Sequence, residues 1–291
     1  MKTPPCVRYS SIRSRGPVQQ FRFLRLVAPG FGTNFMTLPI LAYTVPSLAL
    51  GGGSDSVLIL MRWVHLIAGI TWIGLLYFFV LVNGNFLAEL DPKLRMTIIP
   101  KLMPRAMWWF RWSSFVTVIV GFGYWNYIVG TDARNAIAMG GTASPGAVIG
   151  SFVVIWTLAF AIEMGAVMSP VPALKKPSVL GVVVAIVLVA AAYVFLALNQ
   201  NGWESNRTLA IGIGGGLGWF MMFNVWGIVW RMQKKLIRWN EAALADGTPI
   251  PAEAAKYAQI SSAVARVSFW VSFPMLFFMG ASSHYLIFVR R

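Results

Sequence analysis

The residues of this sequence that could do chemistry are the few polar side chains inside its long apolar segments. Five stand out, namely Arg62, His65, Glu163, Asn224 and His284. A polar group is costly to bury in lipid, so it usually faces the interior of a helix bundle or a cavity. These positions are therefore the first candidates for ligand binding, proton transfer or metal ligation.

The two histidines, His65 and His284, are candidates for a haem-iron site. Histidine is the commonest metal ligand, and two neutral imidazoles from different helices can ligate a b-type haem. Gly69 follows His65 by one helical turn, which would leave room for a flat ligand beside the ring. Two alternatives stay open: a histidine that binds substrate or transfers protons without haem, and one that only hydrogen-bonds to a neighbouring helix.

Arg62 and Glu163 could act chemically or serve only the structure. Arg62 shares a helical stripe with His65, where it either extends to the membrane interface or pairs with an anionic ligand. Glu163 lies past the middle of its apolar segment, where an unpaired carboxyl group would suit a proton relay. The alternative for Glu163 is an ion pair with a basic neighbour such as Arg111 or Arg266.

The elements that must position these residues are transmembrane helices. Of the 291 residues, 57% are hydrophobic and only 11% are charged, which excludes an ordinary soluble domain. The apolar runs approach the roughly 20 residues that a helix needs to cross a bilayer, and they lack the alternation of barrel strands. The sequence predicts an all-α, polytopic transmembrane helix bundle with about six spans, at 57–82, 112–130, 147–169, 179–198, 209–230 and 267–289.

The segments between these spans carry turn and charge signals. The connection 83–111 contains the turn signals Asp91-Pro92, Pro100 and Pro104. The polar stretch 231–266 is typical of a solvated helical hairpin. Inside the fifth span, the glycines of 212–218 follow no strand, so they predict close helix packing and not a nucleotide-binding loop.

Basic residues indicate the orientation of the bundle. Lys and Arg number 13 in the connections 83–111, 170–178 and 231–266, against 4 in the other three flanks. The positive-inside rule therefore predicts a multi-pass protein of the inner (cytoplasmic) membrane with its C-terminus outside. The net charge of +15 is then explained by topology, and no nucleic-acid partner is expected.

The first 56 residues form a basic leader before the predicted transmembrane domain, 57–291. Residues 38–50 are apolar and are followed by three glycines, which is typical of a signal peptide and equally of an extra, short helix. A third interpretation is that the natural protein begins at Met36. The single cysteine, Cys6, excludes the Cys-x-x-Cys-His attachment of a covalent c-type haem in this chain.

Three motifs in order along the chain resemble the membrane domain of bacterial cytochrome-linked urate oxidases. They are RWVHLIAGITWIG at 62–74, MPRAMWWFRW at 103–112, and SFPMLFFM at 272–279 followed by Ser283-His284-Tyr285. The first motif alone also resembles copper-resistance membrane proteins and a family of membrane protoporphyrinogen oxidases. All three together indicate similarity from about Val57 to the C-terminus.

The resemblance implies a membrane enzyme that oxidises urate to 5-hydroxyisourate and passes the electrons to a cytochrome c. Family members typically carry a fused cytochrome c domain on the outer side. This sequence stops at Arg291 without a Cys-x-x-Cys-His motif, so a separate cytochrome c is the expected partner, along with membrane lipid.

Urate is a planar anion, so its oxidation needs a cation, a base and an electron acceptor. Arg62 would supply the cation and His65 or His284 the base, with a haem b between the histidines as the acceptor. The alternative function is a transporter or a non-catalytic protein that handles haem or copper. Such a protein would be expected to show a polar site on broken helices or a Met/His ladder, and neither is evident in the sequence.

Overall fold

The regular structure of this chain is helical wherever it is described. The computed structural model describes residues 53–288, and within them helices account for 86% of the residues and there is no strand. The all-α prediction is therefore confirmed. The predicted leader, 1–56, lies outside the described residues except at its very end, as does the start proposed at Met36.

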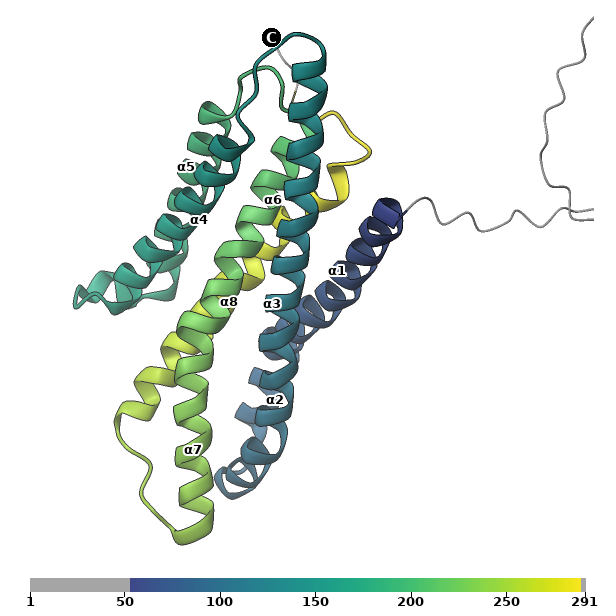
Figure 1. Cartoon of the computed structure of the whole chain (residues 1–291). Coiled ribbons are helices and arrows are strands. Elements are labelled where there is room, and N and C mark those ends of the chain that lie inside the picture. The colour runs from purple at the N-terminus through teal and green to yellow at the C-terminus, as the bar shows by residue number, and fades with distance from the viewer. Residues whose placement is uncertain (1–52, 289–291) are drawn as a thin grey trace, which may run out of the picture. The chain divides into compact units, whose positions relative to one another are not determined.

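The helices follow one another with short breaks (Figure 1), and their bounds are α1 (Gly53–Tyr77), the π-helical η1 (Phe78–Asn83), α2 (Gly84–Glu89), α3 (Pro92–Ala138), α4 (Pro145–Met168), the 3-10 turn η2 (Pro172–Lys175), α5 (Pro177–Leu198), α6 (Asn206–Phe223), the π-helical η3 (Asn224–Val229), α7 (Trp230–Asp246) and α8 (Glu253–Ala281). Helix α6 contacts α3, α4, α5 and α8, so it forms the centre of the bundle. Helix α1 packs mainly on α3, and α4 and α5 form a hairpin.

Five of the described helical segments are long and apolar enough to cross a membrane: Asp55–Glu89, Pro145–Met168, Pro177–Leu198, Asn206–Asp246 and Glu253–Ala281. They coincide with five of the six predicted spans, although the last segment, Glu253–Ala281, ends before the predicted position 289. The remaining prediction, 112–130, lies inside α3, which is 47 residues long but does not belong to these five. The polar and aromatic stretch Tyr124–Tyr127 interrupts the apolar part of that helix.

The predicted connection 83–111 is helical for most of its length. The chain turns at Leu90 and Asp91, and Pro92 then begins α3, since a proline at the first helical position loses no hydrogen bond. Pro100 and Pro104, predicted as turn signals, lie inside α3. Each removes one backbone hydrogen bond, which a long helix tolerates where neighbouring elements support it.

The last helix ends earlier than predicted. Helix α8 stops at Ala281, so the predicted span 267–289 is wrong beyond that residue, and His284 lies in a turn. Asn206, at the start of α6, binds the segment that follows α8. Its Nδ2 donates to the Tyr285 carbonyl at 2.9 Å. Its Oδ1 accepts from the amides two and three residues further on, both at 2.9 Å. One side chain of α6 thus replaces the helical hydrogen bonds of this segment.

The glycines of α6 bring its neighbours close, as predicted for 212–218. A Cβ on Gly216 would overlap the Trp156 indole of α4, and one on Gly212 would overlap the Phe195 ring of α5. Both rings are fully buried. The packing role of these glycines is therefore confirmed, because each missing side chain is replaced by an aromatic ring of the adjacent helix.

Candidate functional site

His65 is a half-buried residue of α1 that α3 holds in place. Its Nδ1 lies 2.7 Å from the carbonyl oxygen of Thr117. A carbonyl oxygen can only accept a hydrogen bond, so Nδ1 carries the ring proton and Nε2 keeps a free lone pair. Histidines that bind metals or accept protons are commonly oriented by a hydrogen bond of this kind.

The space for the His65 ring comes from Gly121 on α3. A Cβ on Gly121 would lie 2.6 Å from both Nδ1 and Cε1 of the imidazole. Gly69, which was expected to leave room for a flat ligand, instead faces α3: a Cβ there would meet Thr117 Cγ2 at 3.6 Å, an ordinary contact. Gly121 is a site residue that the sequence analysis missed, because only the packing of two helices brings it to His65.

Two arginine side chains lie against the ring of Tyr124, which follows Gly121 on α3 by three residues. The guanidinium carbon of Arg62 lies 5.9 Å from the ring centroid and that of Arg207 lies 5.6 Å from it. An Arg207 Nη2 donates to the Tyr124 hydroxyl at 2.8 Å. Arg207 Nε is buried and has no hydrogen-bond partner among the described residues.

These three residues form what we call the arginine cluster: Arg62, Tyr124 and Arg207. Within residues 53–288 neither arginine has an acidic partner. Guanidinium groups bind planar anions through charge-assisted, often bidentate hydrogen bonds. The arginine cluster is therefore suited to an anionic ligand, and its Arg62 lies one helical turn from His65. Arg207 and Tyr124 were not found from the sequence, where each sits among ordinary interfacial residues.

His284 lies in an exposed turn after α8. The carbonyl of the next residue, Tyr285, is bound by Asn206, which precedes Arg207, so the turn and the arginine cluster share the beginning of α6. The hydrogen bond of the His65 side chain goes to Thr117 and not to His284. In the same part of the chain, no group of three or more His, Cys, Asp or Glu side chains is placed to hold a metal ion. Haem ligation by the two histidines stays a prediction.

Glu163 forms a separate, buried polar cluster with Asn224 and Ser268. Its exposed fraction is 1%, and neither carboxylate oxygen has a hydrogen-bond partner of normal geometry among the described residues. The fully buried Asn224 side chain of η3 is close enough to interact with it. Asn224 Nδ2 lies 3.4 Å from Ser268 Oγ of α8, to which it donates.

The ion pair of Glu163 with Arg111 or Arg266 is not formed, so that expectation is wrong. The Arg111 guanidinium instead lies against three indole rings, those of Trp112, Trp226 and Trp230, at 5.5, 5.0 and 4.2 Å from their centroids. A guanidinium is weakly hydrated and stacks on aromatic faces, so tryptophans accommodate this cation without an acid.

We expect Glu163→Gln to change the free energy of unfolding by less than about 1 kcal/mol, because its amide can donate to Asn224 Oδ1. That oxygen is buried and unpartnered among the described residues. Glu163→Leu places an apolar side chain beside the buried Asn224 amide, which then has no polar group to pair with there, and is expected to cost about 1–3 kcal/mol. Thermal unfolding in detergent measures both variants. A glutamine variant as unstable as the leucine variant would contradict the need for a polar side chain beside Asn224.

Comparison with known proteins adds one match. The profile of the family described as urate oxidase N-terminal matches residues 92–291, which is more than half of the chain. The matched region contains Gly121, Tyr124 and Arg207, whereas Arg62 and His65 precede it. No curated protein and no solved structure matches the chain.

Proposed function

The chain belongs to the urate oxidase N-terminal family, and from this premise we propose that it is a membrane-bound oxidoreductase that converts urate to 5-hydroxyisourate. The electrons pass to a cytochrome c. The observation that carries the proposal beyond family membership is the arginine cluster beside His65. It offers an anion-binding group and a free imidazole nitrogen at one end of the bundle.

The reaction takes an oxygen atom from water. The urate anion and one water molecule give the 5-hydroxyisourate anion, two protons and two electrons, with a new C–O bond at C5 of the purine ring. A cytochrome c accepts one electron at a time, so each urate reduces two cytochrome molecules. The protein must therefore hold a planar anion, accept protons and give the electrons a way out.

Each member of the site has a role in this scheme. Arg62 and Arg207 bind the urate anion through charge-assisted hydrogen bonds. Tyr124 positions Arg207, since its hydroxyl accepts from that guanidinium. His65 accepts a proton at Nε2 as the substrate is oxidised, because its other ring nitrogen is bound to the Thr117 carbonyl.

Haem b remains the proposed acceptor inside the membrane. The donor chemistry of His65 fits an iron ligand, because the Nδ1 hydrogen bond directs the Nε2 lone pair away from α3. His284 is the proposed second ligand. A haem held by these two histidines would take up electrons one at a time. In that case His65 would be an iron ligand and could not also be the proton acceptor. Soret absorbance that is lost in His65→Ala separates the two roles.

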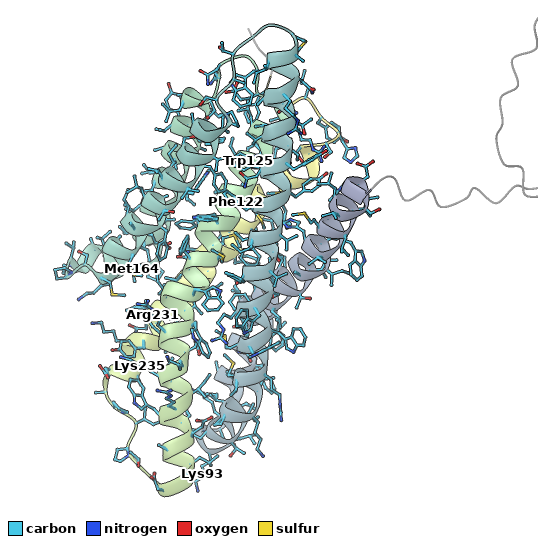
Figure 2. The ribbon with its side chains drawn as sticks, viewed as in Figure 1. Lys93, Phe122, Trp125, Met164, Arg231 and Lys235 are labelled. Carbon is cyan, nitrogen blue, oxygen red and sulfur yellow. The ribbon has the colours of Figure 1, made fainter. Side chains whose placement is uncertain are left out.

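The orientation proposed here puts the arginine cluster on the outer side of the cytoplasmic membrane, with the C-terminus. Basic residues support this, because Lys93, Arg231 and Lys235 lie toward one end of the bundle while Trp125 lies toward the other (Figure 2). The positive-inside rule assigns the end rich in Lys and Arg to the cytoplasm. A cytochrome c on the outer side would then approach the same end as the substrate.

Reduction of added cytochrome c by urate, catalysed by membranes that contain the full chain, tests this function. We expect Arg207→Gln to raise KM for urate about tenfold, because a charge-assisted contact contributes at least about 1.5 kcal/mol. Arg134→Gln is the matched control: Arg134 also lies over a tyrosine, at 5.8 Å from the Tyr127 centroid, but outside the arginine cluster. A wild-type protein without urate-dependent reduction would overturn the proposal, and equal effects of the two substitutions would remove the proposed anion site.

A further inference from the structure

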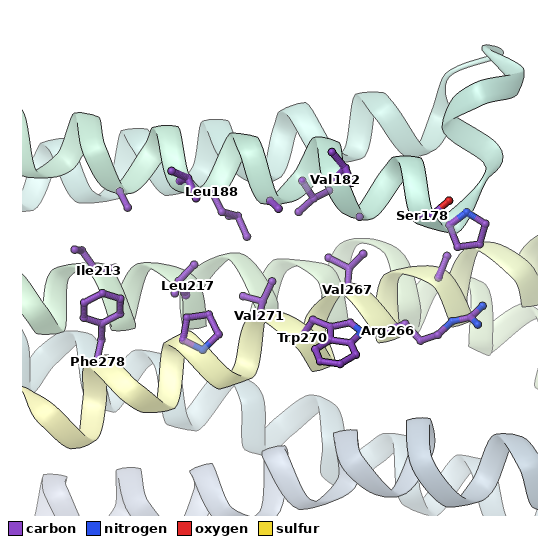
Figure 3. Close-up of a pocket in the computed structure, with 18 residues that line it drawn as sticks. Ser178, Val182, Leu188, Ile213, Leu217, Arg266, Val267, Trp270, Val271 and Phe278 are labelled. Carbon is purple, nitrogen blue, oxygen red and sulfur yellow. The ribbon is translucent and has the colours of Figure 1, made fainter.

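We propose that a groove between α5 and α8 binds one anionic phospholipid, with the phosphate at its basic mouth and an acyl chain along its apolar walls. The groove holds a cavity of about 650 Å³ that is lined by residues of α5, α6 and α8. Figure 3 shows Leu188 of α5 on one side and Leu217 of α6 with Val271 of α8 on the other. The arginine cluster contributes no residue to it.

The walls of the groove suit an acyl chain. Apart from Ser178, Arg266 and the indole of Trp270, the residues that line it carry apolar side chains or none. Val182, Val189 and Trp270 are largely exposed, so the groove opens toward the bilayer. From Arg266 to Phe278, helix α8 rises about 18 Å, close to the roughly 15 Å of hydrocarbon in one leaflet.

The mouth of the groove suits an anion. Ser178 and Arg266 lie at the same end of it (Figure 3), and Lys175 and Lys176 immediately precede α5. All four side chains are exposed. Within residues 53–288 none of the three cations has an acidic partner. Clusters of Lys and Arg at the membrane surface attract anionic lipid headgroups, and this end is the one predicted to face the cytoplasm.

The N-terminal leader of this chain has an apolar stretch and is another possible occupant of the groove, but its charge disfavours it. The leader that precedes Asp55 carries Lys2 and five arginines and no acidic residue, so its approach would add like charge at a basic mouth. A phospholipid such as phosphatidylglycerol supplies both the negative charge and an acyl chain. The basic mouth and the apolar walls of the groove together therefore favour an anionic lipid.

Lipid binding to the purified full chain in detergent tests the proposal. Native mass spectrometry would compare phosphatidylglycerol with phosphatidylcholine carrying the same acyl chains. We expect the wild-type protein to bind phosphatidylglycerol about tenfold more tightly, and Arg266→Gln to remove most of that preference. Arg238→Gln, which changes an exposed-helix arginine outside the groove, should keep the preference.

A second variant tests the groove itself. Gly181 lines the groove, and a Cβ there would meet nothing within 4 Å, so Gly181→Phe would fill the space without disturbing the fold. The control is Gly165→Phe on α4, where a Cβ is equally unobstructed but outside the groove. Loss of phosphatidylglycerol binding in Gly181→Phe alone supports the proposal. Equal binding of both lipids to the wild type, or unchanged binding in Gly181→Phe, overturns it, as does a protein segment or second copy found in the groove.

Discussion

Replacement of His65 with alanine is expected to lower the kcat/KM of urate-dependent cytochrome c reduction by about 100-fold or more, the usual contribution of a positioned acid or base. The ring is half-buried and its one hydrogen bond within the described residues goes to the Thr117 carbonyl, so its removal should leave the helices folded. Activity per amount of folded protein in membranes is the measurement. Activity equal to wild type would remove His65 from the site.

Gly121→Ala and Gly69→Ala test whether activity depends on the position of the His65 imidazole and not only on its presence. Gly121→Ala keeps His65 but places a Cβ 2.6 Å from Nδ1 and Cε1, so the ring must shift, and we expect its hydrogen bond to Thr117 to be lost. We expect a fall in kcat of about tenfold or more, since misplacement of a catalytic group by about 1 Å can cost 100-fold. Gly69→Ala, on the same helix pair, meets Thr117 only at 3.6 Å and should stay near wild type. Full activity in Gly121→Ala would show that the orientation of His65 is unimportant.

Replacement of Gly216 with alanine is expected to lower the free energy of unfolding by about 3 kcal/mol, at the upper end of overpacking costs in a core. Its Cβ would overlap the five-membered and six-membered ring atoms of Trp156, including Cε2, Nε1 and Cδ2. Trp156 is fully buried, with an exposed fraction of 0%, so its ring has no open space to enter. Helices α4 and α6 must therefore separate to admit one methyl group.

The control for this variant lies two residues further along α6. A Cβ on Gly218 would lie 3.8 Å from the Met275 sulfur, an ordinary contact, so Gly218→Ala should be neutral or slightly stabilising. Thermal unfolding in detergent compares the two alanines directly. Equal melting temperatures would contradict the close packing of Trp156 on Gly216.

The sequence predicted most of the helices because the demands of a bilayer are local. Lipid offers the backbone no hydrogen-bond partners, so each long apolar run must be helical, whatever its neighbours are. The prediction failed at the end of α8, where a side chain of another helix replaces the helical hydrogen bonds. The segment after Ala281 hydrogen-bonds to Asn206 of α6 and does not continue α8. Helix α3, in contrast, continues through Pro100 and Pro104, although proline favours turns.

The site was only partly within reach of the sequence. Arg62 and His65 could be singled out because charge and imidazole are rare in apolar runs. Gly121 and Arg207 could not, since a glycine in a helix and an arginine at a helix start are ordinary features. Glu163 was recognised as unusual, but the arginine pair that was one of two interpretations is not formed, and its carboxyl group lies close to the Asn224 side chain.

Composition and local spacing were enough to predict most of the helices, the family and the rare polar residues, because each of these features depends on residues near one another in the chain. The fold was needed to see which side chains meet: His65 meets Thr117 and Gly121, and Arg62 and Arg207 both lie against the Tyr124 ring. Contacts between helices depend on how their surfaces interlock, and that fit joins residues whose separation along the chain carries no information about their distance in space.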